Sequence, residues 1–159
     1  MVVCNSGPLI ALGGIDRLGL LRDLFGVVRV PEEVVYEWQQ GGATLTGLDA
    51  LNLATWIETE TLPHAPDPLL VSLLDIGEAR AIELAKLHHP SLLLMDEARG
   101  RRVARDVYGM QVVGTGRVLV EAKRAGFLDA VRPCLDAIRA NGYWISDKIV
   151  AEILRQAFE

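Results

Sequence analysis

The stretch SLLLMDEARG, residues Ser91–Gly100, decides the fold, because four apolar residues run directly into two carboxylates. Leu92–Met95 show no alternation of apolar and polar side chains, so a strand here would be covered on both faces, as in a parallel sheet. Asp96 would then follow the strand, and open α/β sheets usually hold their ligands in the crevice beyond the strand ends. A structural alternative is equally open, in which Asp96 only caps a helix predicted over 97–108.

Other short apolar runs alternate with helical patterns along the rest of the chain. This order predicts β-α-β steps and a parallel sheet. The predicted strands are residues 2–4, 27–30, 56–59 and 111–113 in addition to 92–95. The predicted helices include 117–125, 127–140 and 147–158, the last capped by Ser146, and a short helix around Leu48, Leu51 and Leu53.

The composition predicts a single globular domain over residues 1–159. Half of the residues are hydrophobic and 23% are charged, which excludes the disordered class. The net charge of −5 excludes a surface that is basic everywhere, so any contact with nucleic acid needs a local patch. Arg99, Arg101, Arg102 and Arg105 form one such patch, although a solvated helix face explains the same pattern.

The cysteines and the apolar segments indicate the cellular compartment in which the protein is expected. Cys4 and Cys134 lack the spacing of a zinc site or a disulfide framework, which fits buried thiols in a reducing compartment. No segment has the roughly 20 apolar residues of a membrane span. The N-terminus has no basic region or cleavage site of a signal peptide. We therefore expect a cytoplasmic protein that does not bind membranes.

Polar side chains stand at three predicted ends of strands or helices. Asn5 follows the first strand, Asp96 and Glu97 follow the central strand, and Glu78 opens a helix. In a parallel sheet these groups could converge, and carboxylates without His or thiolate suit a hard ion such as Mg²⁺ or Mn²⁺. For Glu78 the simpler explanation is an acid in the first helical turn, which the helix dipole favours.

Five segments together resemble the PIN-domain family, and most closely its VapC-like branch of uncharacterised PIN-like proteins. The resemblance covers nearly the whole chain, and the order and spacing of the segments make it specific. The segments are Asn5–Ile10, Gly77–Ile82, Leu93–Arg99, Val113–Thr115 and Gly142–Asp147.

The resemblance implies a three-layer α/β/α sandwich around a mainly parallel sheet, with a helical extension at about 127–159. Active members are metal-dependent ribonucleases. Asp96 and Glu78 match two of the family's acids, Thr115 matches a hydroxyl that borders the site, and Glu97 is a candidate auxiliary ligand. The implied catalytic residues are therefore Asp96, Glu78, Asn5 and Thr115, and the implied ligands of Mg²⁺ or Mn²⁺ are Asp96, Glu78, Asn5 and Glu97.

Asn5 departs from the pattern, because the family places its leading Asp there. A carboxamide can offer one oxygen to a metal, but it adds no negative charge and cannot act as a base. Three explanations are open: a weakened nuclease, a scaffold that binds without cleaving, or an Asn introduced in place of a natural Asp.

Two functions follow from the resemblance. The first is a VapC-toxin-like endoribonuclease that hydrolyses RNA phosphodiester bonds, with Arg99 and Arg102 positioning the RNA backbone. The second is an inert PIN-like module that binds RNA or an antitoxin-like protein. A homodimer and a small antitoxin-like partner are expected by analogy with the family.

Overall fold

The sheet of the protein has five parallel strands in the order β3-β2-β1-β4-β5. The computed structural model describes residues 1–41 and 54–159. The strands are β1 Val2–Cys4, β2 Val28–Pro31, β3 Ile57–Glu60, β4 Leu93–Leu94 and β5 Val112–Val113. The predicted parallel sheet is confirmed, and each strand lies within one residue of the run that predicted it.

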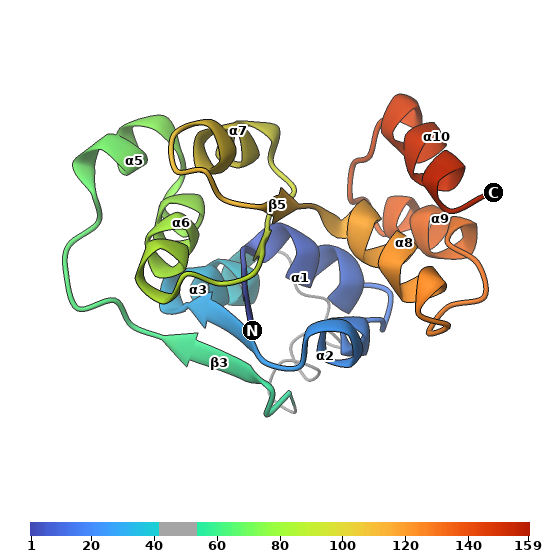
Figure 1. Ribbon diagram of the computed structural model, residues 1–159, viewed down its shortest axis with the longest axis horizontal. Coiled ribbons are helices and arrows are strands. Elements are labelled where there is room, and N and C mark those ends of the chain that lie inside the picture. The colour runs from blue at the N-terminus through green and yellow to red at the C-terminus, as the bar shows by residue number, and fades with distance from the viewer. Residues whose placement is uncertain (42–53) are drawn as a thin grey trace.

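Helices connect the strands and cover the sheet (Figure 1). They are α1 Ser6–Gly13, α2 Gly19–Phe25, α3 Glu32–Gly41, α5 Pro68–Leu73, α6 Ile76–His88, α7 Ala98–Asp106, α8 Thr115–Arg124, α9 Arg132–Ala140 and α10 Asp147–Gln156. None of the described helices is long and apolar enough to cross a bilayer. The predicted short helix around Leu48, Leu51 and Leu53 lies outside the described residues.

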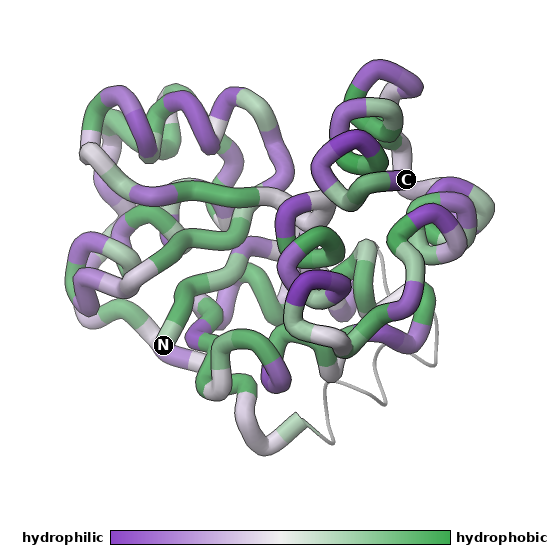
Figure 2. The backbone as a smooth tube through the Cα atoms, turned by 45° about the vertical axis from the view of Figure 1, so that its right-hand side comes forward, coloured by the Kyte–Doolittle hydropathy of each residue, from purple (hydrophilic) through white to green (hydrophobic). Residues whose placement is uncertain are grey.

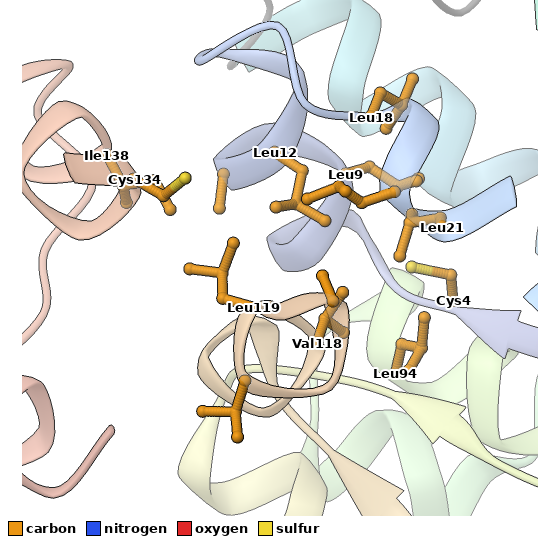
Figure 3. Close-up of a cluster of buried hydrophobic side chains, with 14 of the residues drawn as sticks. Cys4, Leu9, Leu12, Leu18, Leu21, Leu94, Val118, Leu119, Cys134 and Ile138 are labelled. Atoms are coloured by element: carbon orange, nitrogen blue, oxygen red, sulfur yellow. The ribbon is translucent and has the colours of Figure 1, made fainter. Parts of the chain in front are cut away.

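Each face of the sheet packs into its own hydrophobic cluster, as expected for strands without polar alternation. Val2 and Cys4 point into a cluster with α1, α2 and α8, which Figure 3 shows around Leu9 and Leu119. Val3, between them, points to the opposite face, where residues of α6 and α7 cover it. The hydropathy colouring agrees, with green segments in the middle of the molecule and mixed green and purple along the outer helices (Figure 2). The predicted α/β sandwich with helices on both faces is confirmed.

The C-terminal helices pack beside α8 and are fixed to it by the last residue. One carboxylate oxygen of Glu159 accepts from Lys123 Nζ at 2.8 Å and from the backbone N–H of Val131 at 2.7 Å. Its second oxygen accepts from the N–H of Arg132 at 3.0 Å. Because these two N–H groups lie at the start of α9, the acid also complements the helix dipole.

One predicted helix boundary is wrong. The helix expected from Phe127 begins at Arg132, because the preceding segment ends α8 instead. Gly126 adopts a positive φ of 80°, and the N–H of Phe127 donates to the carbonyl of Ala122 at 2.8 Å. This geometry is a helix C-terminal motif that favours glycine. Pro133 then lies in the first turn of α9, where its missing N–H costs nothing.

Candidate functional site

The sheet topology places Asn5 next to the two acids that follow β4. β1 and β4 are neighbours, with Cys4 paired to Leu94, and the N–H of Asn5 donates to the carbonyl of Leu94 at 2.9 Å. The chain leaves β1 toward β2 on one side and leaves β4 toward β5 on the other. Such a reversal of strand order opens a crevice at the carboxyl ends of the strands, where α/β proteins bind their ligands.

Three donors hold the Asp96 carboxylate. The backbone N–H of Thr115 donates to Oδ1 at 2.7 Å, and the Thr115 hydroxyl donates to Oδ2 at 2.6 Å. The hydroxyl of Tyr143 also donates to Oδ2, at 2.7 Å. Burial and the charge of Asp96 raise the pKa of Tyr143 well above its ordinary value, so the phenol keeps its proton and acts as a donor.

The alternative role of Asp96 as a helix cap is wrong. The residue at the N-cap position of α7 is Glu97, and no side chain caps that helix. Asp96 instead points at the N-terminus of α8, whose first residue is Thr115. The free N–H groups and dipole of a helix N-terminus stabilise a negative charge, so the fold holds Asp96 in place for a role other than starting α7.

Asn5 binds Glu97 and leaves one oxygen without a partner. Asn5 is 1% exposed, and its Nδ2 donates to Glu97 Oε2 at 3.2 Å. Its Oδ1 is buried and finds no hydrogen-bond donor among residues 1–41 and 54–159, which is costly unless a ligand satisfies it. Burial, and then the charge of Asp96, raise the pKa of Glu97.

Glu78 has the structural role that the first-turn alternative predicted, and it is also strongly perturbed. It forms a capping box with Asp75: the N–H of Glu78 donates to Asp75 Oδ1 at 2.8 Å, and the N–H of Asp75 donates to Glu78 Oε2 at 3.1 Å. Burial raises the pKa of Glu78 to about 7, with further contributions from the charges of Asp75, Glu97 and Glu37. Capping alone does not require an acid whose ionised form is this unfavourable.

Glu37, on α3, belongs to this neighbourhood and was not predicted from the sequence. Its Oε1 accepts from the N–H of Gly77 at 3.0 Å. Burial raises its pKa, followed by the charge of Asp75. The pattern of α3 shows acids at Glu32, Glu33 and Glu37, but nothing in it indicates which of them faces α6.

Five carboxylates therefore act on one another at this edge, and we call them the acidic cluster: Glu37, Asp75, Glu78, Asp96 and Glu97. Within residues 1–41 and 54–159, no Lys, Arg or His forms an ion pair with any of them. Glu78 is buried, Glu37, Asp96 and Glu97 are half-buried, and Asp75 is exposed. Carboxylates that lose water without gaining a counter-charge tend to take up protons or bind a cation. The acidic cluster is thus suited to a positive ligand.

The side chains do not form a preassembled metal cluster. Among the described residues, no three Asp, Glu, His or Cys side chains are grouped so that they could hold an ion. Asp96 is turned toward Thr115 and Tyr143, whereas Glu78 is turned toward Asp75. Mg²⁺ commonly uses one or two protein carboxylates together with waters and phosphate oxygens. The donors present, together with the unpartnered Asn5 oxygen, fit that kind of site.

A cavity of about 1200 Å³ opens beside Asp96 and Glu97, between β5, α8 and α10. Arg101 and Lys148 line it together with Thr115. The two arginines predicted to position RNA, Arg99 and Arg102, are exposed on α7 but do not line this cavity. Their role stays a prediction.

A parallel α/β sheet with polar and acidic side chains at its switch point defines a class of proteins that bind ligands at the carboxyl ends of their strands. Over residues 1–159 the sequence matches the PIN-domain family DUF3368, and the chain belongs to that family. PIN domains are typically metal-dependent nucleases and commonly bind Mg²⁺ or Mn²⁺. No curated protein and no solved structure was found to match the chain.

Proposed function

We propose that the protein is a VapC-toxin-like endoribonuclease that requires Mg²⁺ or Mn²⁺ and hydrolyses RNA phosphodiester bonds. The observation that carries the proposal is the acidic cluster, which lies at the switch point of the sheet around the buried Glu78 and has no ion-pair partner among the described side chains. Membership of the PIN-domain family supports nuclease chemistry for this edge.

Asp96 and Glu78 would hold the ion, with Glu97 and the Asn5 oxygen as auxiliary ligands. When bound, Mg²⁺ or Mn²⁺ at this site activates water and stabilises the charge that develops on the phosphate. Thr115 orients Asp96 through two hydrogen bonds. Asn5 cannot take a proton from water, so the activity should be weaker than that of a chain with an acid there.

The proposed function also implies three partners: RNA, an antitoxin-like protein and a second copy of the chain. Arg99 and Arg102 would hold the RNA backbone through phosphate contacts, which orient the strand without reading its sequence. A small antitoxin-like protein would cover the acidic edge in the resting complex, and two copies of the chain would form a homodimer. These encounters would take place in the cytoplasm.

Cleavage of a single-stranded RNA is the direct test. The wild-type protein should cut the RNA with Mn²⁺ and stop when EDTA is added, while Asp96→Asn should cut at most about 1% as fast. Asp106→Asn, an exposed acid on α7, is the matched control and should keep full activity. Mn²⁺-dependent cleavage that Asp96→Asn retains would overturn the proposal.

A second function, an inert module that binds RNA or an antitoxin-like protein, is favoured by one contact. The amide of Asn5 donates a hydrogen bond to Glu97, so the position of the family's leading acid supports a carboxylate of the cluster instead of adding a negative charge to it. An inert module would bind RNA in EDTA as tightly as in Mn²⁺ and would show no cleavage. The same assay therefore separates the two functions.

A further inference from the structure

We propose that Tyr143 is a positioning residue for Asp96, which makes the segment between α9 and α10 part of the metal site; this inference rests on the proposed function. Tyr143 lies 47 positions from Asp96 in the sequence, and its hydroxyl donates to Asp96 Oδ2 at 2.7 Å. No other described side chain except Thr115 donates to this carboxylate.

The phenol is held in place from both ends. The N–H of Tyr143 donates to the carbonyl of Ile138, in α9, at 3.2 Å, and its ring packs against the larger hydrophobic cluster. Ile145, two residues later, is 8% exposed, and Ser146 then caps α10 through the N–H of Ile149. The hydroxyl therefore reaches Asp96 from a segment that contacts α9 on one side and leads into α10 on the other.

Glycines leave room for the pair formed by the Tyr143 hydroxyl and the Asp96 carboxylate. A Cβ on Gly7 would come 3.0 Å from the hydroxyl of Tyr143 and 3.2 Å from Asp96 Oδ2. A Cβ on Gly114 would come 2.6 Å from Asp96 Oδ1. A side chain at Gly114 would thus clash with the carboxylate, and a side chain at Gly7 would crowd the carboxylate and the Tyr143 hydroxyl.

The hydrogen bonds distinguish the two oxygens of Asp96. Oδ2 accepts from two hydroxyls, those of Thr115 and Tyr143, which occupy its two lone pairs. Oδ1 accepts only the N–H of Thr115 among the described donors, so one lone pair of Oδ1 is free for a cation. Tyr143 therefore determines which oxygen faces the ion, the kind of support that hydrogen-bonded ligands receive in metal sites.

Calorimetric titration with Mn²⁺ of wild-type protein, Tyr143→Phe and Tyr108→Phe tests the inference. Phe keeps the ring and removes only the hydroxyl, and Tyr108, whose ring lies under Lys86, is the matched control. We expect Tyr143→Phe to bind Mn²⁺ about 10-fold more weakly than wild type, and Tyr108→Phe to bind as wild type does. Gly7→Ala, which crowds the same pair, should also weaken binding.

The RNA cleavage rate gives a second readout that a purely structural role would not change. Tyr143→Phe should cut slowly at limiting Mn²⁺ and recover at saturating Mn²⁺, because only the affinity for the ion is reduced. Unchanged or tighter Mn²⁺ binding by Tyr143→Phe would overturn this inference alone. Wild-type protein that takes up no Mn²⁺ would overturn the proposed function and this inference with it.

Discussion

Helix α6 carries two groups of buried charged side chains within one turn of each other. One group forms ion pairs, and the other forms none with the described residues. Arg80 is 3% exposed and Glu83 is 5% exposed. Arg80 Nε donates to Glu33 Oε1 at 2.8 Å, and Arg80 Nη1 donates to Glu83 Oε2 at 2.7 Å. Glu78, two residues before Arg80 and 5% exposed, has no such partner within the described part of the chain. The first group is neutralised by the protein, whereas the second is not.

The same contrast appears on α3, one helical turn apart. Glu33 pairs with Arg80, while Glu37, a member of the acidic cluster, accepts the N–H of Gly77 and forms no ion pair with a described residue. Buried charges are tolerated in a fold when they are paired, as in the group around Arg80, which we call the arginine network. An unpaired group at the same depth costs stability, so it indicates a role beyond folding.

Breaking the arginine network should have the largest effect on stability. Arg80→Met leaves Glu33 and Glu83 without their cation, so we expect a loss of about 3–5 kcal/mol in the free energy of unfolding. Denaturation in urea measures this. Arg155→Met, which removes an exposed ion pair with Glu152, is the control and should leave the free energy of unfolding nearly unchanged, because solvent screens exposed pairs. Equal losses in the two variants would remove the contrast between the groups.

Neutralising the acidic cluster should have the opposite sign in metal-free protein. Glu78→Gln keeps an oxygen for the N–H of Asp75 and removes a buried charge, so we expect a gain on the order of 2 kcal/mol at pH 8. Wild-type stability should fall as the pH rises from the ordinary range of a carboxyl group through about 7, because the folded pKa of Glu78 is raised to about 7. Below that window both states bind the proton, and the variant loses its advantage. Urea denaturation in EDTA at pH 4 and pH 8 checks the sign, and destabilisation of Glu78→Gln at pH 8 would contradict it.

Asn5→Asp adds a negative charge to the acidic cluster. The variant loses the amide that donates to Glu97 and adds a like charge, so metal-free stability should fall by about 1–2 kcal/mol, or one acid should take up a proton. With Mn²⁺ the order should reverse: Asn5→Asp should bind the ion more tightly and cleave RNA faster than the parent. Thermal unfolding with and without Mn²⁺ measures the binding of the ion, and the RNA cleavage rate measures the activity. If Asn5→Asp gains neither stabilisation by Mn²⁺ nor a faster cleavage rate, the inert module is favoured.

The exposed arginines of α7 should have the smallest effect. If Arg99 and Arg102 contact phosphates, each replacement by Ala should lower the salt slope of RNA binding by roughly 0.7. Fluorescence anisotropy over a range of NaCl concentrations measures the slope. Arg155→Ala is the control, because its side chain is 73% exposed on α10. A double variant with unchanged affinity and slope would show that Arg99 and Arg102 are only a solvated face.

The fold and part of the site could be predicted from the sequence because both depend on a local pattern of apolar and polar residues. Apolar runs that end in polar residues mark both the strands and their carboxyl ends, so the sequence alone predicts Asn5 and Asp96 at one edge of the sheet. Glu37 and Tyr143 could not be found in this way. The packing of α3 on α6 selects Glu37, and the contact of Tyr143 with Asp96 spans 47 positions, which no local pattern encodes.

Thermal unfolding at increasing Mn²⁺ concentration tests the central claim, that the acidic cluster is a cation site. A ligand at 100 times its dissociation constant stabilises the folded state by about 2.7 kcal/mol, which raises the melting temperature of a chain of this size by roughly 5–10 °C. We predict such a rise for the wild-type protein and for Glu152→Gln, an exposed control, and a much smaller rise for Asp96→Asn. A melting temperature that does not change with Mn²⁺, or that rises equally in Asp96→Asn, would contradict the claim.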